Sequence, residues 1–60
     1  MKAENPLEKK IFKVSSVSGD YATLIEEASR EELFIALALL PIGTDIGTRL
    51  EYENFEFTII

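Results

Sequence analysis

The chain has 60 residues, 47% of them hydrophobic, and its six Lys and Arg residues against eleven Asp and Glu residues give a net charge of -5. This length allows one small domain, which buries only roughly 60% of the surface that its unfolded chain exposes. With neither cysteine nor histidine, disulfides, thiolate chemistry, and the commonest metal ligand and general base are excluded. The negative charge disfavours nucleic-acid and membrane partners.

Residues 1–8 predict a flexible tail ahead of a single domain over residues 9–60. The tail is polar, contains Pro6 and shows no hydrophobic periodicity. The longest apolar run, Leu33 to Leu40, has eight residues, whereas a membrane helix needs about twenty. The first residues also lack the apolar stretch of a secretory signal. We therefore expect a cytoplasmic protein with no membrane partner.

After the tail, short apolar-alternating runs separated by turn residues are typical of an all-β fold. The first hairpin is predicted at Gly19-Asp20, a pair that suits a tight two-residue turn and places Val17 opposite Ala22. The preceding apolar residue, Val14, is then out of phase, since alternation along a strand has a period of two. One extra residue at Ser15-Ser16, a β-bulge, returns it to the inner face.

Residues 29–41 carry signals for both a helix and a strand. Ser29-Arg30-Glu31-Glu32 matches a helix capping box, and Pro41 would end the helix. The residues between are apolar on every side, however, and so small a chain cannot bury a helix all round. We therefore predict a strand from Glu32 to Leu37 and then a helical turn from Ala38 to Leu40, with a helix as the alternative.

The last hairpin is predicted from its cross-strand pairs. If Glu53-Asn54 forms the turn, Tyr52 pairs with Phe55 and the apolar residues further along both strands share that face. Phe57 then lies on the same face as Phe55, and Phe12 on the first strand also points inward. These four aromatic residues are expected to form the core.

Together these elements predict an all-β fold: a small five-stranded antiparallel barrel of the SH3-like or OB-like kind, with a short helical turn before Pro41. Residues 41–47, with one proline and two glycines, form the loop before the last hairpin. A barrel this small is filled by its own side chains. We therefore expect no pocket that could shelter a catalytic pair.

The second hairpin is apolar on both faces. A four-residue loop at residues 28–31 places Leu24 opposite Ile35 on the inside. The large apolar side chains left on the outside are those of Tyr21, Ile25 and Phe34. Apolar strips on the outside of small soluble domains often mark contact surfaces. These three residues are the candidate site for a protein partner or a second copy, unless the tail or the last strand covers them.

Other candidate chemistry is weaker. Glu26-Glu27 and Glu31-Glu32 flank one turn but lack the spacing and glycine of a calcium loop. Residues 43–47 lack the lysine and the following helix of a phosphate-binding loop. We therefore predict no metal, no cofactor, no catalytic residue and no enzyme. The alternative function, a nucleic-acid-binding small barrel, depends on the only cluster of basic residues, which is Lys9, Lys10 and Lys13.

Three short segments carry a resemblance to a known family. Gly19-Asp20-Tyr21-Ala22 follows the first strand, Glu31-Glu32-Leu33-Phe34-Ile35 opens the third, and Leu39-Leu40-Pro41-Ile42-Gly43 is followed by Gly47 and Leu50. In this order and spacing they resemble the domain-of-unknown-function family 3006, small bacterial proteins of uncharacterised role. The resemblance implies a small β-barrel and no established activity. The chain departs from the family pattern in its apolar C-terminal strand, where a charged tail is expected.

Overall fold

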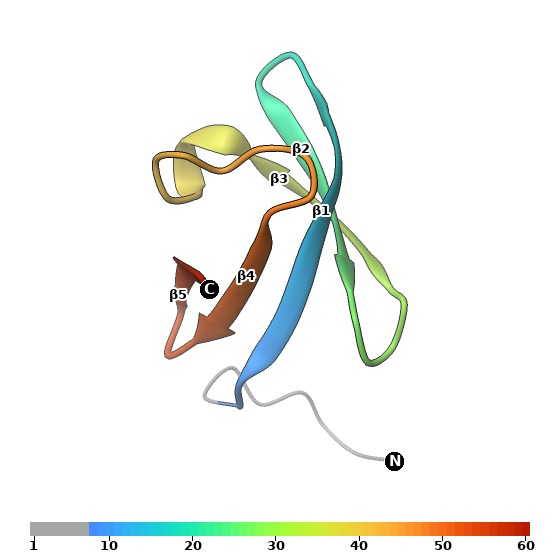
Figure 1. The fold of residues 1–60 in the computed structure, drawn as a ribbon, viewed down its shortest axis with the longest axis vertical. Coiled ribbons are helices and arrows are strands. Elements are labelled where there is room, and N and C mark those ends of the chain that lie inside the picture. Colours follow the sequence, from blue (N-terminus) through green and yellow to red (C-terminus); the bar gives the residue numbers. More distant parts are fainter. Residues whose placement is uncertain (1–7) are drawn as a thin grey trace.

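The computed structural model describes residues 8–60, which form a five-stranded antiparallel sheet and one turn of 3-10 helix (Figure 1). The elements are β1 (Lys10–Ser18), β2 (Tyr21–Glu26), β3 (Glu32–Ala36), η1 (Leu37–Leu39), β4 (Arg49–Glu53) and β5 (Glu56–Ile59). The predicted all-β class is confirmed. The predicted flexible tail, residues 1–8, lies outside the described residues except for Glu8.

The sheet is open, so the predicted closed barrel is not confirmed. Its strand order is β3-β2-β1-β4-β5, and within residues 8–60 no ladder of hydrogen bonds joins β3 to β5. In Figure 1 the β4–β5 hairpin lies to the left of the long strand β1, whereas the β2–β3 hairpin crosses β1 and has its turn to the right. Closure requires the first and last strands of the order to meet along their length. Here those two strands have only five and four residues.

The first hairpin has the predicted turn, register and bulge. Gly19 has a φ of 59°, the left-handed conformation expected in the turn, and Val17 lies opposite Ala22. The register then shifts between Val14 and Ser16, so that β1 has one more residue than β2 at this point. This extra residue returns Val14 to the inner face, where it is buried.

The second hairpin is a strand pair, as predicted, but its register differs by two residues. Leu24 lies opposite Leu33 instead of Ile35. The four-residue turn covers residues 27–30 because Arg30 adopts a left-handed φ of 65°, and the Glu26 amide donates to the Glu31 carbonyl at 2.9 Å. A shift of two preserves the faces of a strand. The strand ends one residue before the predicted end, and η1 takes the place of the predicted helical turn.

The last hairpin also differs by two residues from the prediction. Its turn is Asn54-Phe55, with left-handed φ values of 55° and 64°, the pattern of a type I′ turn. Tyr52 therefore lies opposite Phe57. Phe55 sits in the turn with 69% of its surface exposed, so its assignment to the core is wrong. The twist of a type I′ turn matches that of the strands, which favours this position over Glu53-Asn54.

The core lies on the inner face of the sheet. Six apolar residues are buried: Phe12, Val14, Ala22, Leu24, Leu40 and Leu50. Val17, Ile35, Leu37, Tyr52 and Phe57 pack around them and are half-buried. Residues 41–47 form the predicted loop, which connects η1 to β4. No helix within the described part of the chain has the length and apolar character needed to cross a membrane.

Candidate functional site

The three residues predicted to form a contact surface lie on the outer face of the sheet. Tyr21 and Phe34 are 53% and 73% exposed, and their rings stack with a centroid distance of 6.1 Å and an interplanar angle of 10°. Ile25 is half-buried on the same face. Thr23 lies opposite Phe34, and Ala36 lies opposite Tyr21. We call these five residues the outer apolar face.

A row of three charged side chains and one apolar side chain runs along the border of this face. The registers place Glu32 opposite Ile25, Ile25 opposite Lys13, and Lys13 opposite Arg49, so all four share the outer side across four neighbouring strands. The row therefore has an acidic residue at its β3 end, an apolar residue next to it, and basic residues toward β4.

Arg49 at the basic end of the row is held by Glu27. Its Nε and one terminal nitrogen donate to the two carboxylate oxygens of Glu27 at 2.9 and 3.0 Å. This hydrogen bonding lowers the pKa of the Glu27 carboxyl below its usual value and raises the pKa of Arg49. Lys13 thus presents its charge next to Ile25, while the charge of Arg49 is neutralised locally.

A broad depression adjoins the outer apolar face. It has a volume of about 710 Å³ and lies between Ile25 and Ile46, with Lys13, Glu27 and Arg30 among its lining residues. Ile46 belongs to the loop before β4 and is exposed. Sequence reasoning missed it, because nothing in the loop sequence indicates which side of the sheet an isolated apolar residue will reach.

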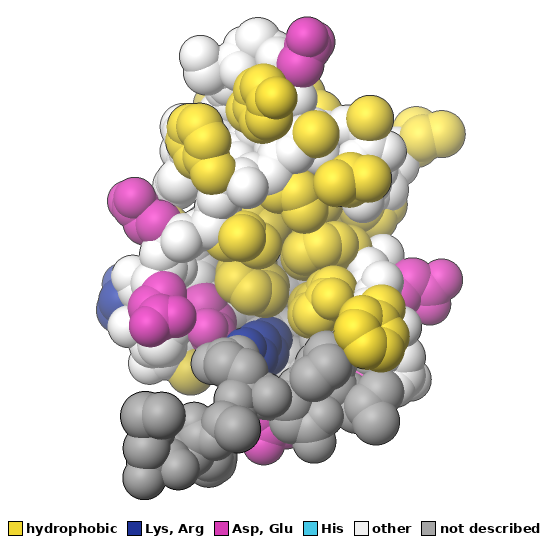
Figure 2. All heavy atoms as spheres, turned by 180° about the vertical axis from the view of Figure 1, so that it is seen from behind, with side chains coloured by type: hydrophobic (Ala, Val, Ile, Leu, Met, Phe, Trp, Pro, Cys, Tyr) yellow, Lys and Arg dark blue, Asp and Glu magenta, His cyan; other side chains and the backbone are white. Residues whose placement is uncertain are grey.

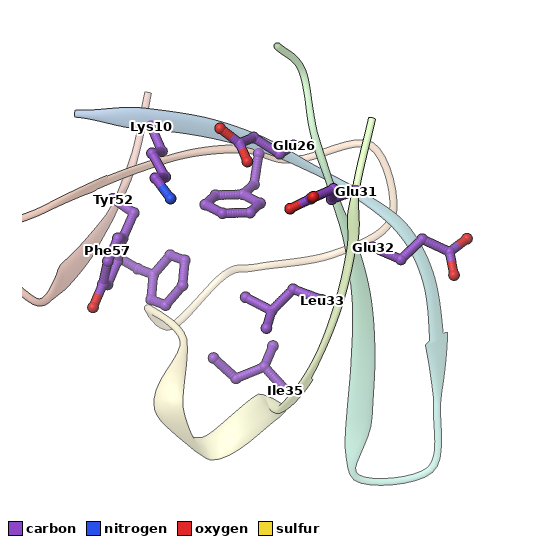
Figure 3. Close-up of a pocket in the computed structure, with 9 residues that line it drawn as sticks. Lys10, Glu26, Glu31, Glu32, Leu33, Ile35, Tyr52 and Phe57 are labelled. Carbon is purple, nitrogen blue, oxygen red and sulfur yellow. The ribbon is translucent and has the colours of Figure 1, made fainter. Parts of the chain in front are cut away.

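An apolar groove lies on the inner side, between β3 and the β4–β5 hairpin (Figure 3). Its volume is about 350 Å³, and we call it the inner groove. Its apolar lining comes from Phe12, Leu33, Ile35, Tyr52 and Phe57. The sequence predicted an interior filled by its own side chains, and the structure has a groove here instead. Because the sheet stays open, these side chains line a concave surface.

The aromatic residues of the groove hold one another in place. The Phe57 ring lies 6.0 Å from Phe12 in an edge-to-face arrangement and 4.6 Å from Tyr52. Such pairs contribute about 0.5–1.5 kcal/mol beyond the area that they bury. The wall formed by β4 and β5 is therefore fixed to the floor formed by β1.

Charged residues lie at one end of the inner groove. Lys10, Glu26 and Glu31 are near its mouth, and Figure 3 shows the Glu32 carboxylate pointing away from it. The Glu26 carboxylate accepts a hydrogen bond from the Ser29 hydroxyl at 2.9 Å, which ties it to the turn. This end of the groove has more acidic than basic side chains.

The basic cluster that motivates the nucleic-acid alternative is divided between the two faces. Lys13 is on the outer side, and Lys10 lines the inner groove. Lys9 forms a salt bridge with Glu51 at 3.4 Å.

Within residues 8–60, no group of three or more acidic, histidine or cysteine side chains could hold a metal ion.

Apolar side chains are prominent on the molecular surface. On the side shown in Figure 2 they form a continuous strip down the middle, with acidic side chains at its borders. Apolar residues that are exposed singly are normal on a monomer, whereas contiguous apolar patches often mark contact surfaces.

Comparison with known proteins gives no match: neither a family model, nor a curated protein, nor a solved structure matches the chain. The resemblance to family 3006 therefore stays a prediction.

Proposed function

We propose that this chain is a non-catalytic interaction module that self-associates, with the outer apolar faces of two copies packed against each other. The observation that carries the proposal is the stacked and exposed pair of Tyr21 and Phe34. Large rings left in water are costly, and their burial dominates the energetics of many interfaces. We also propose that the open sheet is a variant of the SH3-like or OB-like barrel, since it has five antiparallel strands and a 3-10 turn before β4.

Charge complementarity favours a second copy as the partner. A contact between identical faces related by a two-fold axis must be self-complementary. The outer face carries Glu32 on one side of Ile25 and Lys13 on the other. A two-fold axis that lies parallel to the sheet along β2 brings the acidic side of one copy over the basic side of the other. Apolar contact then lies at the centre and ion pairs at the rim, as in stable interfaces.

Sedimentation velocity tests this proposal at physiological ionic strength. The wild-type chain is expected to form a dimer, and Phe34→Glu is expected to be a monomer, because the substitution buries an unpaired charge at the centre of the contact. Phe55→Glu is the matched control. Phe55 is equally an exposed phenylalanine but lies in the β4–β5 turn, away from the outer face, so this variant should remain a dimer.

Exchanging the charges of Lys13 and Glu32 tests whether the partner is a second copy of the chain. Lys13→Glu is expected to weaken the dimer several-fold, and the double variant Lys13→Glu/Glu32→Lys is expected to restore it, because both sides of the contact come from the same chain. The proposal fails if wild type and Phe34→Glu are both monomers of equal stability. It also fails if the double variant is weaker than the single one, since Lys13 of one copy would then not face Glu32 of the other.

A further inference from the structure

Within residues 8–60, one edge of β3 pairs with no other strand. Two hydrogen bonds bracket its pairing with β2: the Glu26 amide donates to the Glu31 carbonyl, and the Leu37 amide donates to the Asp20 carbonyl. Bonded pairs alternate along an antiparallel ladder. The backbone groups of Leu33 and Ile35 therefore face β2. The amides and carbonyls of the residues between and beside them, Glu32, Phe34 and Ala36, face the free edge.

Across the groove, β5 likewise has one edge that no other described strand pairs with. The Ile60 amide donates to the Arg49 carbonyl, which fixes the bonded pairs between β4 and β5. The backbone groups of Phe57 and Ile59 then point away from β4. Each of the two outermost strands of the described sheet thus presents backbone donors and acceptors on its free edge. An edge of this kind is a template for another strand unless it is protected.

The inner groove between these edges suits the alternate side chains of an extended segment. Leu33 and Ile35 form one wall, Tyr52 and Phe57 the other, and Phe12 the floor. Its volume of about 350 Å³ is at the small end of the range for ligand pockets, roughly 300–1,000 Å³. Leu33 is 38% exposed although it lies opposite the fully buried Leu24. A segment lying on β3 would cover it.

The charges at the mouth of the groove select the chemistry of that segment. Glu26 and Glu31 stand there with Lys10, so the carboxylates are in excess. The chain as a whole has a charge of -5. A basic side chain at one end of the bound segment is therefore attracted, and an acidic one is repelled.

We propose that the inner groove binds an extended segment of another polypeptide as a sixth strand along β3. The segment carries apolar side chains at alternate positions and a basic residue at the end near Glu31. Its backbone pairs with the free edge of β3, and its inward side chains pack between the walls. This is strand addition, in which backbone hydrogen bonds give affinity and pockets for alternate side chains give specificity. The groove lies on the opposite side of the sheet from the outer apolar face, so the two proposals are independent.

NMR titration of the full-length chain with synthetic peptides tests this inference. The probe peptide alternates threonine with valine or isoleucine. At one end it carries a lysine, which lies on the same face of the extended peptide as the valine and isoleucine side chains. The control peptide has glutamate in place of the lysine. Shifts are expected in the amides of β3 and β5 and in the groove side chains. The glutamate peptide is expected to bind about fivefold more weakly, as for an exposed ion pair that is lost and replaced by a repulsion.

Leu33→Thr and Leu39→Thr form a matched pair of variants. Both replace an exposed leucine, but Leu33 lines the groove and Leu39 lies in η1 and does not. Leu33→Thr should weaken binding of the lysine peptide about tenfold, the effect of one lost apolar contact in a groove. Leu39→Thr should bind like the wild type. Both should sediment like the wild type, which separates this proposal from self-association.

Three results would overturn the inference. The first is an absence of shifts in β3 at millimolar peptide, which would leave the groove closed to a strand from outside. The second is equal binding of the two peptides and the two variants, which would make the contact non-specific. The third is conversion of a dimer to a monomer by Leu33→Thr, because a second copy would then be the occupant of the groove.

Discussion

Replacing Phe55 with glycine is expected to make the domain more stable, although it removes an aromatic ring. Phe55 has a φ of 64° in the β4–β5 turn, and a left-handed conformation costs a non-glycine residue about 1–2 kcal/mol. Glycine avoids this cost but loses about 0.5–1 kcal/mol more conformational entropy on folding. The ring is 69% exposed, so little burial is lost. The free energy of unfolding should rise by about 0.5–1 kcal/mol.

Thermal unfolding followed by circular dichroism measures this change. For a domain of this size the melting temperature should rise by roughly 2–8 °C. Phe57→Ala is the matched comparison two residues along the strand, where the ring packs on Phe12 and Tyr52. It should lower the free energy of unfolding by about 2–3 kcal/mol, below the loss for a fully buried ring. A loss for Phe55→Gly as large as that for Phe57→Ala would refute the turn, because Phe55 would then belong to the core.

Two further predictions concern the salt bridge and the bulge. The lowered pKa of Glu27 means that its contribution to stability is present above its unfolded pKa and is lost as the pH falls through the folded pKa. Urea unfolding of Glu27→Gln should therefore show a smaller loss of stability toward acid than the wild type, and high salt should remove the difference. Deletion of Ser15 should leave cooperative unfolding intact, since Ser15 is the unpaired residue of the bulge and Val14 would still face Leu24 in a regular ladder. Ser15→Ala, which keeps the residue count, should also unfold cooperatively, and loss of cooperative unfolding in the deletion variant alone would count against the bulge.

The bulge and the extended backbone at Leu33 were predictable because each follows from a count or a burial argument. The spacing of Val14 and Val17 does not allow both to face inward from a regular strand. Both can do so only if one of the residues between them is left unpaired in a bulge. A helix through Leu33 would be apolar on all sides. The fold class follows from these two features with the turn at Gly19-Asp20.

The registers of the other two hairpins were not predictable, because they depend on left-handed residues that are not glycine. Arg30 and Phe55 adopt positive φ, and nothing in their chemistry signals it. The faces of the strands were nevertheless correct, since each error was two residues. Tyr21 and Phe34 therefore occur together on the outside as expected, whereas Phe55 does not reach the core.

The inner groove was not predictable from local patterns. Ile35 and Phe57 were predicted from the sequence to face the interior, and they do point inward. Whether such side chains fill a barrel or line a groove depends on how closely the two end strands approach. That distance is a property of the whole sheet, set by its twist and by the short lengths of β3 and β5.

Because β3 is apolar on both faces, its side chains alone do not determine its register against β2. A slip by a single residue would exchange Leu33 and Ile35 for Phe34 on the inner side, at little cost in burial, so hydrophobic patterning alone does not forbid it. The turn at residues 27–30 does, through the left-handed Arg30 and the hydrogen bonds of Ser29 to Glu26 and to the Glu31 amide. A solvent-exposed loop, more than the strand that follows it, thus determines which side chains meet a partner on either side of the sheet.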